Sequence, residues 1–217
     1  MSAHDAGPRW PTAAATSREG FVQLETLAGR SPTWRPAAAA SAGEAVVSFW
    51  REAGPGLWFA KDPAFDRRFR ERFFTLHEEV AEGAHRGWLA TANAALGLVL
   101  LLDQFPRNAF RGTPRMYLTD AMARQTAGAA MGAGFDRAFD ASLRLFFRLP
   151  FAHSENLDDQ DRSVALARDL GEPHLTRAKH HRDIIHRFGR FPHRNPILGR
   201  AMTPEEQRFL DNGGYAG

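Results

Sequence analysis

Hydrophobic residues recur at helical spacing along most of the chain after residue 42. Phe65, Phe69, Phe73, Leu76 and Val80 are separated by four, four, three and four positions, which is the spacing of one face of an amphipathic helix. Two later sets follow the same rule: Phe135, Phe139, Leu143 and Phe146, and then Ala178, His181, Ile185 and Phe188. No stretch of the sequence alternates as a β-strand does. The pattern predicts an all-α domain of seven or eight helices that pack as antiparallel pairs.

Helix-start signals and one long apolar stretch refine this picture. Asp62 followed by Pro63 is typical of a helix N-terminus, and Thr203-Pro204-Glu205-Glu206 matches a capping box with Pro at the first helical position. Residues 88–102 are apolar nearly all round, which indicates a central, buried helix. This stretch of 15 residues is shorter than the roughly 20 that cross a bilayer, so we expect no membrane partner.

The first 41 residues differ in composition from the rest, being rich in Ala, Pro, Ser, Gly and Arg. They predict a largely irregular tail with one short helix near residues 21–27, followed by a single domain over residues 42–217. The opening residues contain Asp5, Pro8 and Pro11 and no apolar core, unlike a secretory signal. We therefore expect a cytoplasmic protein.

The charge distribution is uneven although the total is small. The 217 residues carry 26 Arg and 2 Lys against 25 acidic side chains, a net charge of +3. Residues 174–200 alone carry +6 and five histidines, and the remainder carries −3. The acidic counterpart is residues 154–161, where Ser154 is a candidate helix cap. The absence of cysteine from the sequence excludes disulfides, thiolate metal sites and a cysteine nucleophile.

Two similar sequences are predicted to end helices. Residues 102–108 read Leu-Asp-Gln-Phe-Pro-Arg-Asn, and residues 188–195 read Phe-Gly-Arg-Phe-Pro-His-Arg-Asn. In both, Pro is expected to stop the helix. The sequence leaves two explanations open, an internal duplication of a helical half and a chance resemblance of two turns. Arg107 and Arg194, beside Asn on these rigid turns, are either receptors for a carboxylate or phosphate or ion-pair partners of the acids at 154–161.

Signals for catalysis and metal binding are weak. The sequence has no Walker A, Gly-x-Ser-x-Gly or His-Glu-x-x-His motif. Glu82-x-x-His85 and Asp183-x-x-His186 have the spacing of di-iron ligands, but the glycine in the first motif and the lack of further glutamate partners argue against such a site. We therefore predict no metal and no cofactor. His153 with Glu155 or Asp158 is a candidate acid–base pair, for which no nucleophile is specified.

Two features of residues 174–188 also have plain structural interpretations. His181 falls on the apolar stripe with Ile185, where a hydrogen-bonded core histidine is more common than a ligand. Asp183 and Arg187 have the spacing of a helical ion pair.

Several long motifs of the chain are shared with a known family. They are residues 101–108, the Pro-Phe-x-His-Ser-Glu block at 150–155 with Asp159-Gln160, residues 187–195, residues 203–206 with Phe209-Leu210, and residues 46–50 with Trp58-Phe59. Over about residues 42–212 the chain resembles the bacterial domain of unknown function 924 family. The resemblance implies a helical, tetratricopeptide-like right-handed superhelix and no assigned activity. Leu149 and Ala152 stand where the family pattern leads us to expect Tyr and Met, a difference expected to alter a pocket wall.

The polar motifs are predicted to meet in one groove. The candidate ligand-binding residues are Asp103, Gln104, Arg107, Asn108, His153, Glu155, Gln160, His181, Arg182, Arg190, His193, Arg194 and Asn195. We predict a binding scaffold whose arginines hold a small anionic ligand or a peptide. One alternative is an enzyme that uses His153 or His193 as the acid–base group of the same site. The other is RNA binding through residues 174–200, although Phe188 and Phe191 resemble helix-end anchors more than a stacking platform. The sequence predicts neither the ligand nor the oligomeric state.

Overall fold

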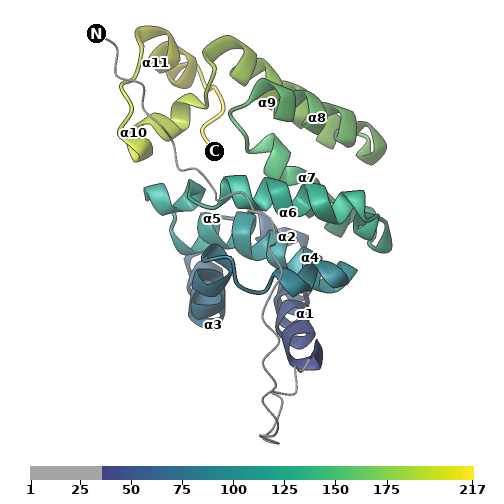
Figure 1. Ribbon diagram of the computed structural model, residues 1–217. Helices are drawn as coiled ribbons and strands as arrows, with labels where there is room; N and C mark the ends of the chain where they lie inside the picture. Colours follow the sequence, from purple (N-terminus) through teal and green to yellow (C-terminus); the bar gives the residue numbers. More distant parts are fainter. Residues whose placement is uncertain (1–35) are drawn as a thin grey trace, which may run out of the picture. The chain divides into compact units, whose positions relative to one another are not determined.

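The computed structural model describes the backbone of residues 36–217 and the side chains from residue 42 onward. Its helical elements are α1 (Pro36–Ala53), α2 (Pro55–Trp58), α3 (Pro63–Ala81), η1 (Arg86–Ala90), α4 (Ala92–Val99), η2 (Leu100–Gln104), α5 (Phe105–Ala109), η3 (Pro114–Tyr117), α6 (Asp120–Gly132), η4 (Phe135–Ala138), α7 (Ala141–Ala152), α8 (Leu157–Ala167), η5 (Arg168–Leu170), α9 (His174–Phe188), η6 (Pro192–Arg194), α10 (Asn195–Leu198) and α11 (Pro204–Asp211) (Figure 1). Eight of them in this part have eight residues or more. Residues 36–217 contain no strand, so the all-α fold class is confirmed.

Helices that follow one another in the second half of this region also pack against one another. α6 packs on α7, α7 on α8, and α8 on α9, while α4 contacts both α1 and α6 (Figure 1). One large cluster of buried apolar side chains runs from α1 to α7, and a small second cluster joins α9 to the η6 turn. The right-handed superhelix remains a prediction.

The predicted face of α3 is confirmed, and so are two predicted caps. Phe65, Phe69, Phe73 and Val80 are buried in the large cluster. The backbone N–H of Phe65 donates to the Asp62 side chain at 2.8 Å. Thr203 and Glu206 form the expected reciprocal capping box at the start of α11.

The predicted helical face at residues 135–146 is wrong in its first half. Residues 135–138 form a short 3-10 helix after Gly134, whose φ of 75° is left-handed. Helix α7 begins only at Ala141, because the Asp140 side chain accepts hydrogen bonds from the backbone N–H groups of Ser142 and Leu143. Local capping therefore separates apolar residues that share a helical spacing.

The central apolar stretch differs from the prediction at both ends. Helix α4 begins at Ala92, after the N-cap Thr91, and not at residue 88. It continues without a break through the π-helical turn η2 into α5, so Pro106 lies inside the helical segment and does not end it.

Side-chain hydrogen bonds at the π-helical turn explain how this segment tolerates Pro106. Pro has no N–H to donate to the carbonyl four or five residues earlier, which here belongs to Leu102 or Leu101. The Thr119 hydroxyl donates to the Leu102 carbonyl at 2.6 Å. The His77 Nδ1 atom lies 2.9 Å from the Leu101 oxygen, which only accepts, so Nδ1 is the protonated nitrogen. Two side chains therefore replace the missing backbone donor.

The second Phe-Pro turn is built differently. Helix α9 ends at Phe188 because Gly189 follows in the left-handed conformation, with φ of 68°. Pro192 lies three residues beyond Gly189 and opens the 3-10 turn η6. The prediction that Pro stops the helix in both motifs is thus wrong for both. Internal duplication therefore stays a hypothesis. The two motifs are similar in sequence but differ in backbone conformation.

Helices α1 and α4 approach each other through a pair of glycines. A Cβ atom placed on Gly97 of α4 would lie 2.6 Å from the Gly43 carbonyl oxygen of α1. Only a residue without a side chain fits at that distance, because Cβ atoms do not approach oxygen so closely. The two glycines therefore set how deeply α1 packs against the central segment.

The domain boundary predicted at residue 42 falls inside a helix. Helix α1 begins at Pro36, so the last six residues assigned to the irregular tail are helical. The physical reason is local: Pro suits the first helical position, and four alanines follow it. The short helix predicted near residues 21–27 lies outside the described residues. Within the described chain, no helix combines the length and apolar character needed to cross a bilayer.

Candidate functional site

The three polar motifs converge on one cavity of 430 Å³. Six of the predicted ligand-binding residues line it: Gln104, Arg107, Asn108, His153, His193 and Arg194. They come from the π-helical turn, from α5, from the C-cap of α7 and from the η6 turn. Asp103 lies directly behind this lining, in contact with both His153 and Arg107. Segments nearly ninety positions apart in sequence therefore contribute to a single polar site. We call it the polar cavity.

Asp103 and His153 form a buried pair at the back of the polar cavity. His153 Nδ1 lies 2.8 Å from Asp103 Oδ1, and the Gln104 side-chain amide donates to Asp103 Oδ2 at 2.6 Å. Burial alone would raise the pKa of Asp103, but the charge of Arg107 and the hydrogen bonds from His153 and Gln104 outweigh it and hold the pKa at about 2. Asp103 is therefore ionised at neutral pH and can only accept a hydrogen bond.

The ionised Asp103 fixes the tautomer of His153. Burial, together with the positive charge of Arg107, lowers the pKa of His153, so the ring is neutral at pH 7. Because Asp103 accepts, Nδ1 is the nitrogen that carries the proton. The other ring nitrogen, Nε2, is left with an unshared electron pair. A neutral histidine oriented by a carboxylate is the arrangement that general bases use.

Two arginines share one carboxylate at the side of the polar cavity. Arg107 donates to both oxygens of Asp120, at 2.8 and 3.0 Å. Arg194 approaches the same carboxylate only to 3.8 Å, and its hydrogen bond goes to the His153 backbone carbonyl at 2.9 Å. Its guanidinium group lies over the rings of Tyr117 and Phe191, at 4.5 and 4.6 Å from their centroids. Arg194 is thus held in place without a bidentate carboxylate partner.

Three polar nitrogens at the polar cavity have no hydrogen-bond partner within the described chain. They are Nε of Arg194, Nδ2 of Asn108 and Nδ1 of His193. Arg194 and Asn108 are each only 7 % exposed, so water does not readily take the place of a partner. Burial and the nearby Arg194 charge lower the pKa of His193 to about 4, which leaves that ring neutral at pH 7.

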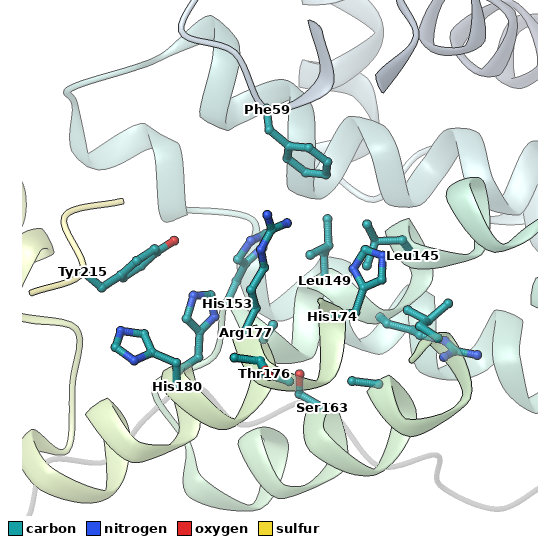
Figure 2. Close-up of a pocket in the computed structure, with 16 residues that line it drawn as sticks. Phe59, Leu145, Leu149, His153, Ser163, His174, Thr176, Arg177, His180 and Tyr215 are labelled. Carbon is teal, nitrogen blue, oxygen red and sulfur yellow. The ribbon is translucent and has the colours of Figure 1, made fainter. Parts of the chain in front are cut away.

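A second cavity, of 560 Å³, adjoins the first and is mostly apolar. Leu145, Leu149, Ala152, Ala167 and Leu170 supply its apolar wall, and His181 lines it from α9. Figure 2 shows His153 in the middle of this lining, with Tyr215 on one side and Leu149 and Leu145 on the other. We call it the apolar cavity. Leu149 and Ala152 are the two positions at which a change of pocket wall was expected.

A comparison with protein families identifies the family to which the chain belongs. The family model described as "Bacterial protein of unknown function (DUF924)" matches residues 46–214. The chain belongs to the DUF924 family. It is also similar to a solved structure of a protein of unknown function from Agrobacterium tumefaciens. The two share 50 % identity with a TM-score of 0.79, over 81 % of this chain and 99 % of that one. No curated protein matches the chain.

Besides Asp103, five predicted site residues of this DUF924 chain lie outside both cavities. They are Glu155, Gln160, Arg182, Arg190 and Asn195. Gln160 is fully buried and its amide donates to the backbone carbonyls of residues 151, 152 and 154. Arg182 pairs with Asp161 on the surface. The chemistry of these side chains suits an anion site, but the fold directs them away from the cavities.

Glu155, Arg190 and Asn195 belong to a network of internal ion pairs and hydrogen bonds. Arg190 donates to both oxygens of Glu206, at 2.6 and 2.9 Å. Arg200 donates to both oxygens of Glu155, at 2.7 and 3.0 Å, and also to the Asn195 side chain at 2.9 Å. The network fixes the η6 turn, which carries His193 and Arg194. These three residues therefore position the site and do not line it.

The expected partners of several charged side chains are also corrected. Arg107 and Arg194 do not pair with the acids at 154–161; Arg124, Arg182 and Arg200 do. Arg187 pairs with Glu205 and not with Asp183. Ser154 does not cap α8, because Asn156 is the N-cap and Ser154 donates instead to Asp159.

The DUF924 site also contains residues that sequence reasoning missed. Asp120, Tyr117, Tyr215, Lys61 and Phe59 all contact or line it. None of them belongs to a sequence motif whose residue spacing is typical of a catalytic or binding site. Asp120 lies in the first turn of α6, where acidic residues are common because they stabilise a helix. That position therefore predicts a stable helix and not a binding site.

Proposed function

We propose that this protein binds a small anionic molecule, bearing a carboxylate or a phosphate group, in the polar cavity. The observation that carries the proposal is Arg194. Its guanidinium group is buried at the cavity wall, is held between two aromatic rings, and has its nearest carboxylate at 3.8 Å. A planar guanidinium group so placed suits bidentate binding of a carboxylate or phosphate.

The charge balance of the polar cavity supports the same proposal. Arg107 and Arg194 are opposed by Asp103 and Asp120, and His153 is neutral. Lys61, which also lines the polar cavity, adds a positive charge and donates to the Gly217 oxygen at 3.3 Å. Asp103 is fully buried behind the lining, so the charge offered to an entering molecule is positive.

The test is calorimetric titration of the purified full chain with inorganic phosphate and with acetate. We expect binding of at least one probe to fall about 10- to 100-fold in Arg194→Gln, the loss of one charge-assisted contact. Arg187→Gln is the matched control, because Arg187 lies on the surface away from both cavities. Lys61→Ala, an exposed position, tests the same cavity with little risk to folding. Binding that is equal in wild type, Arg194→Gln and Lys61→Ala contradicts the proposal.

The second candidate function is catalysis of hydrolysis at the same cavity, with His153 as general base. The specific observation in its favour is the 2.8 Å contact that orients the neutral His153 through ionised Asp103. A water molecule activated at Nε2 would be the nucleophile, which supplies what the sequence does not specify. The assay is turnover of p-nitrophenyl esters and phosphates. His153→Gln should abolish turnover and preserve binding of the anionic probes; equal turnover in wild type and His153→Gln removes this candidate.

RNA binding, the third candidate, has the least support. The basic residues of 174–200 that carried it are largely paired with acids: Arg182 with Asp161, Arg187 with Glu205, Arg190 with Glu206 and Arg200 with Glu155. Phe191 is buried in the small apolar cluster and Phe188 packs against it, so neither ring offers a face for base stacking.

A further inference from the structure

The polar and apolar cavities have three side chains in common. Phe59, His153 and Tyr215 line both. His153 is the C-cap of α7, Phe59 follows α2, and Tyr215 lies beyond α11, so the wall between the cavities consists of side chains from three separate segments. An extended molecule can therefore occupy both cavities if it matches the chemistry of each.

The apolar cavity has the lining that an aliphatic chain requires. Its wall includes Leu145 and Leu149 from α7, Ala167 from α8 and Leu170 from η5. Its volume of 560 Å³ lies in the range of about 300 to 1,000 Å³ that small-molecule sites occupy. Its polar groups, among them His174 and Arg177, come mainly from α9 (Figure 2). Burial, together with neighbouring His153, lowers the pKa of His181 to about 3, so this histidine adds no charge at pH 7.

Phe59 is the apolar side chain among the three that line both cavities. It is 56 % exposed, one of the few large hydrophobic side chains so placed in the described chain. One face of its ring stacks on Phe146, with centroids 6.0 Å apart and an angle of 16° between the planes. Exposed aromatic surface at a cavity is stabilised when an apolar ligand displaces water from it.

We infer that the ligand is an amphiphile, an aliphatic carboxylate or alkyl phosphate whose anionic head lies at Arg194 and whose chain lies along Leu145 and Leu149. The inference rests on the proposed function, because it places the anion at the same arginine. It adds the class of the molecule. The head group pairs with the Arg194 guanidinium group at the polar cavity, and the chain fills the apolar cavity on the far side of His153.

The test compares acetate, butyrate, octanoate, octyl phosphate and 1-octanol as probes of the full chain by calorimetry, below their aggregation concentrations. Each buried methylene should strengthen binding by about fourfold, so octanoate should bind far more tightly than acetate. The two octyl anions distinguish a carboxylate from a phosphate head. 1-Octanol, which has the chain and no charge, should bind at least 10-fold more weakly than the better anion.

Two variants separate the cavities. Leu149→Gln should weaken octanoate binding at least 10-fold and leave acetate binding unchanged, since Leu149 is only partly buried and lines the apolar cavity alone. Leu157→Gln, at a leucine 38 % exposed and outside both cavities, is the matched control. Arg194→Gln should weaken both probes.

The possible results distinguish failure of this inference from failure of the proposed function. If acetate and octanoate bind equally and both depend on Arg194, the amphiphile is wrong and the anion site stands. If octanoate binding depends on Leu149 and not on Arg194, the amphiphile is wrong. If acetate and phosphate binding are also independent of Arg194, or if no anion binds, the anion site is wrong as well. Tight binding of octanoate that requires Leu149 and Arg194 together supports the inference.

Discussion

His153 and Asp103 stand 50 positions apart and meet through a hydrogen bond of 2.8 Å between Nδ1 and Oδ1. The π-helical turn brings Asp103 to this place from one side, and the C-cap of α7 brings His153 from the other. The pair closes the back of the polar cavity. Its chemistry is therefore set by two backbone irregularities, one inside a helix and one at a helix end.

Replacing Asp103 by Asn should lower the free energy of unfolding by about 3 kcal/mol, because it removes one partner of a buried charge pair. The folded-state pKa of about 2 lies below the ordinary value near 4 of an unfolded carboxyl. This stability is therefore present above pH 4 and is lost as the pH falls toward 2. Urea unfolding of Asp103→Asn at pH 7 and pH 3 measures both effects. Asp183→Asn, at an exposed acid on α9, should stay within about 0.5 kcal/mol of wild type.

Acid should destabilise the protein through His181. Its pKa falls from about 6.5 in an unfolded chain to about 3 in the fold, because of burial and the neighbouring His153. Stability is then complete above pH 6.5 and falls with pH, by about 1.4 kcal/mol per pH unit between pH 6 and pH 4 for this one group. Urea titrations of His181→Gln should show a slope lower by that amount. His186→Gln, on the exposed side of the same helix, should retain the wild-type slope.

The crossing of α1 and α4 should not accept a side chain at residue 97. Gly97→Ala places a Cβ atom 2.6 Å from the Gly43 carbonyl oxygen and should cost about 1 to 3 kcal/mol through displacement of α1. Gly132→Ala, at the end of α6 with no atom near the new Cβ, should be neutral or stabilising by up to about 1 kcal/mol. Thermal unfolding compares the two. Equal melting temperatures for both variants would show that α1 is not held by this contact.

Thr119 should be needed for the helical segment that contains Pro106. Thr119→Val keeps the shape of the side chain but removes the hydroxyl that donates to the buried Leu102 carbonyl at 2.6 Å. An unsatisfied buried acceptor costs about 1 to 3 kcal/mol. The same change at Thr75, an exposed residue of α3, provides the control. A double variant, Thr119→Val with Pro106→Ala, restores a backbone donor and should recover part of the loss in chemical unfolding.

The helical class, the buried face of α3 and the two N-terminal caps followed from local patterns, because periodicity and capping depend on residues within one turn of each other. The continuation of the helix through Pro106 did not. It depends on Thr119 and His77, which lie 13 and 29 positions from the proline and supply side-chain donors that no local rule includes. The residues 135–146 show the opposite case, in which helical spacing persists across a turn made by Gly134 and Asp140.

The sequence motifs predicted for the site do reach the polar cavity, but several of the individual residues predicted from their chemistry do not line it. Arg190 and Arg194 are both arginines and lie four positions apart after the end of α9. Arg190 forms a bidentate pair with Glu206, whereas Arg194 turns to the polar cavity. Arg190 lies between the end of α9 and η6, and Arg194 is the last residue of η6, so the two side chains point in different directions, which composition does not encode. Asp120 was missed for the same reason, since only the fold brings it to Arg107.

The π-helical turn has a consequence for the length of the chain. A π turn contains about one residue more than the α-helical turn it replaces, so it takes up that residue with little added rotation about the helix axis. Deleting a single residue from 100–104 would restore regular winding and leave the residues that follow, Arg107 among them, close to their present orientation. The side chains of the turn itself, Asp103 and Gln104, would change direction most. The polar cavity thus depends on the number of residues in one turn as well as on their identity.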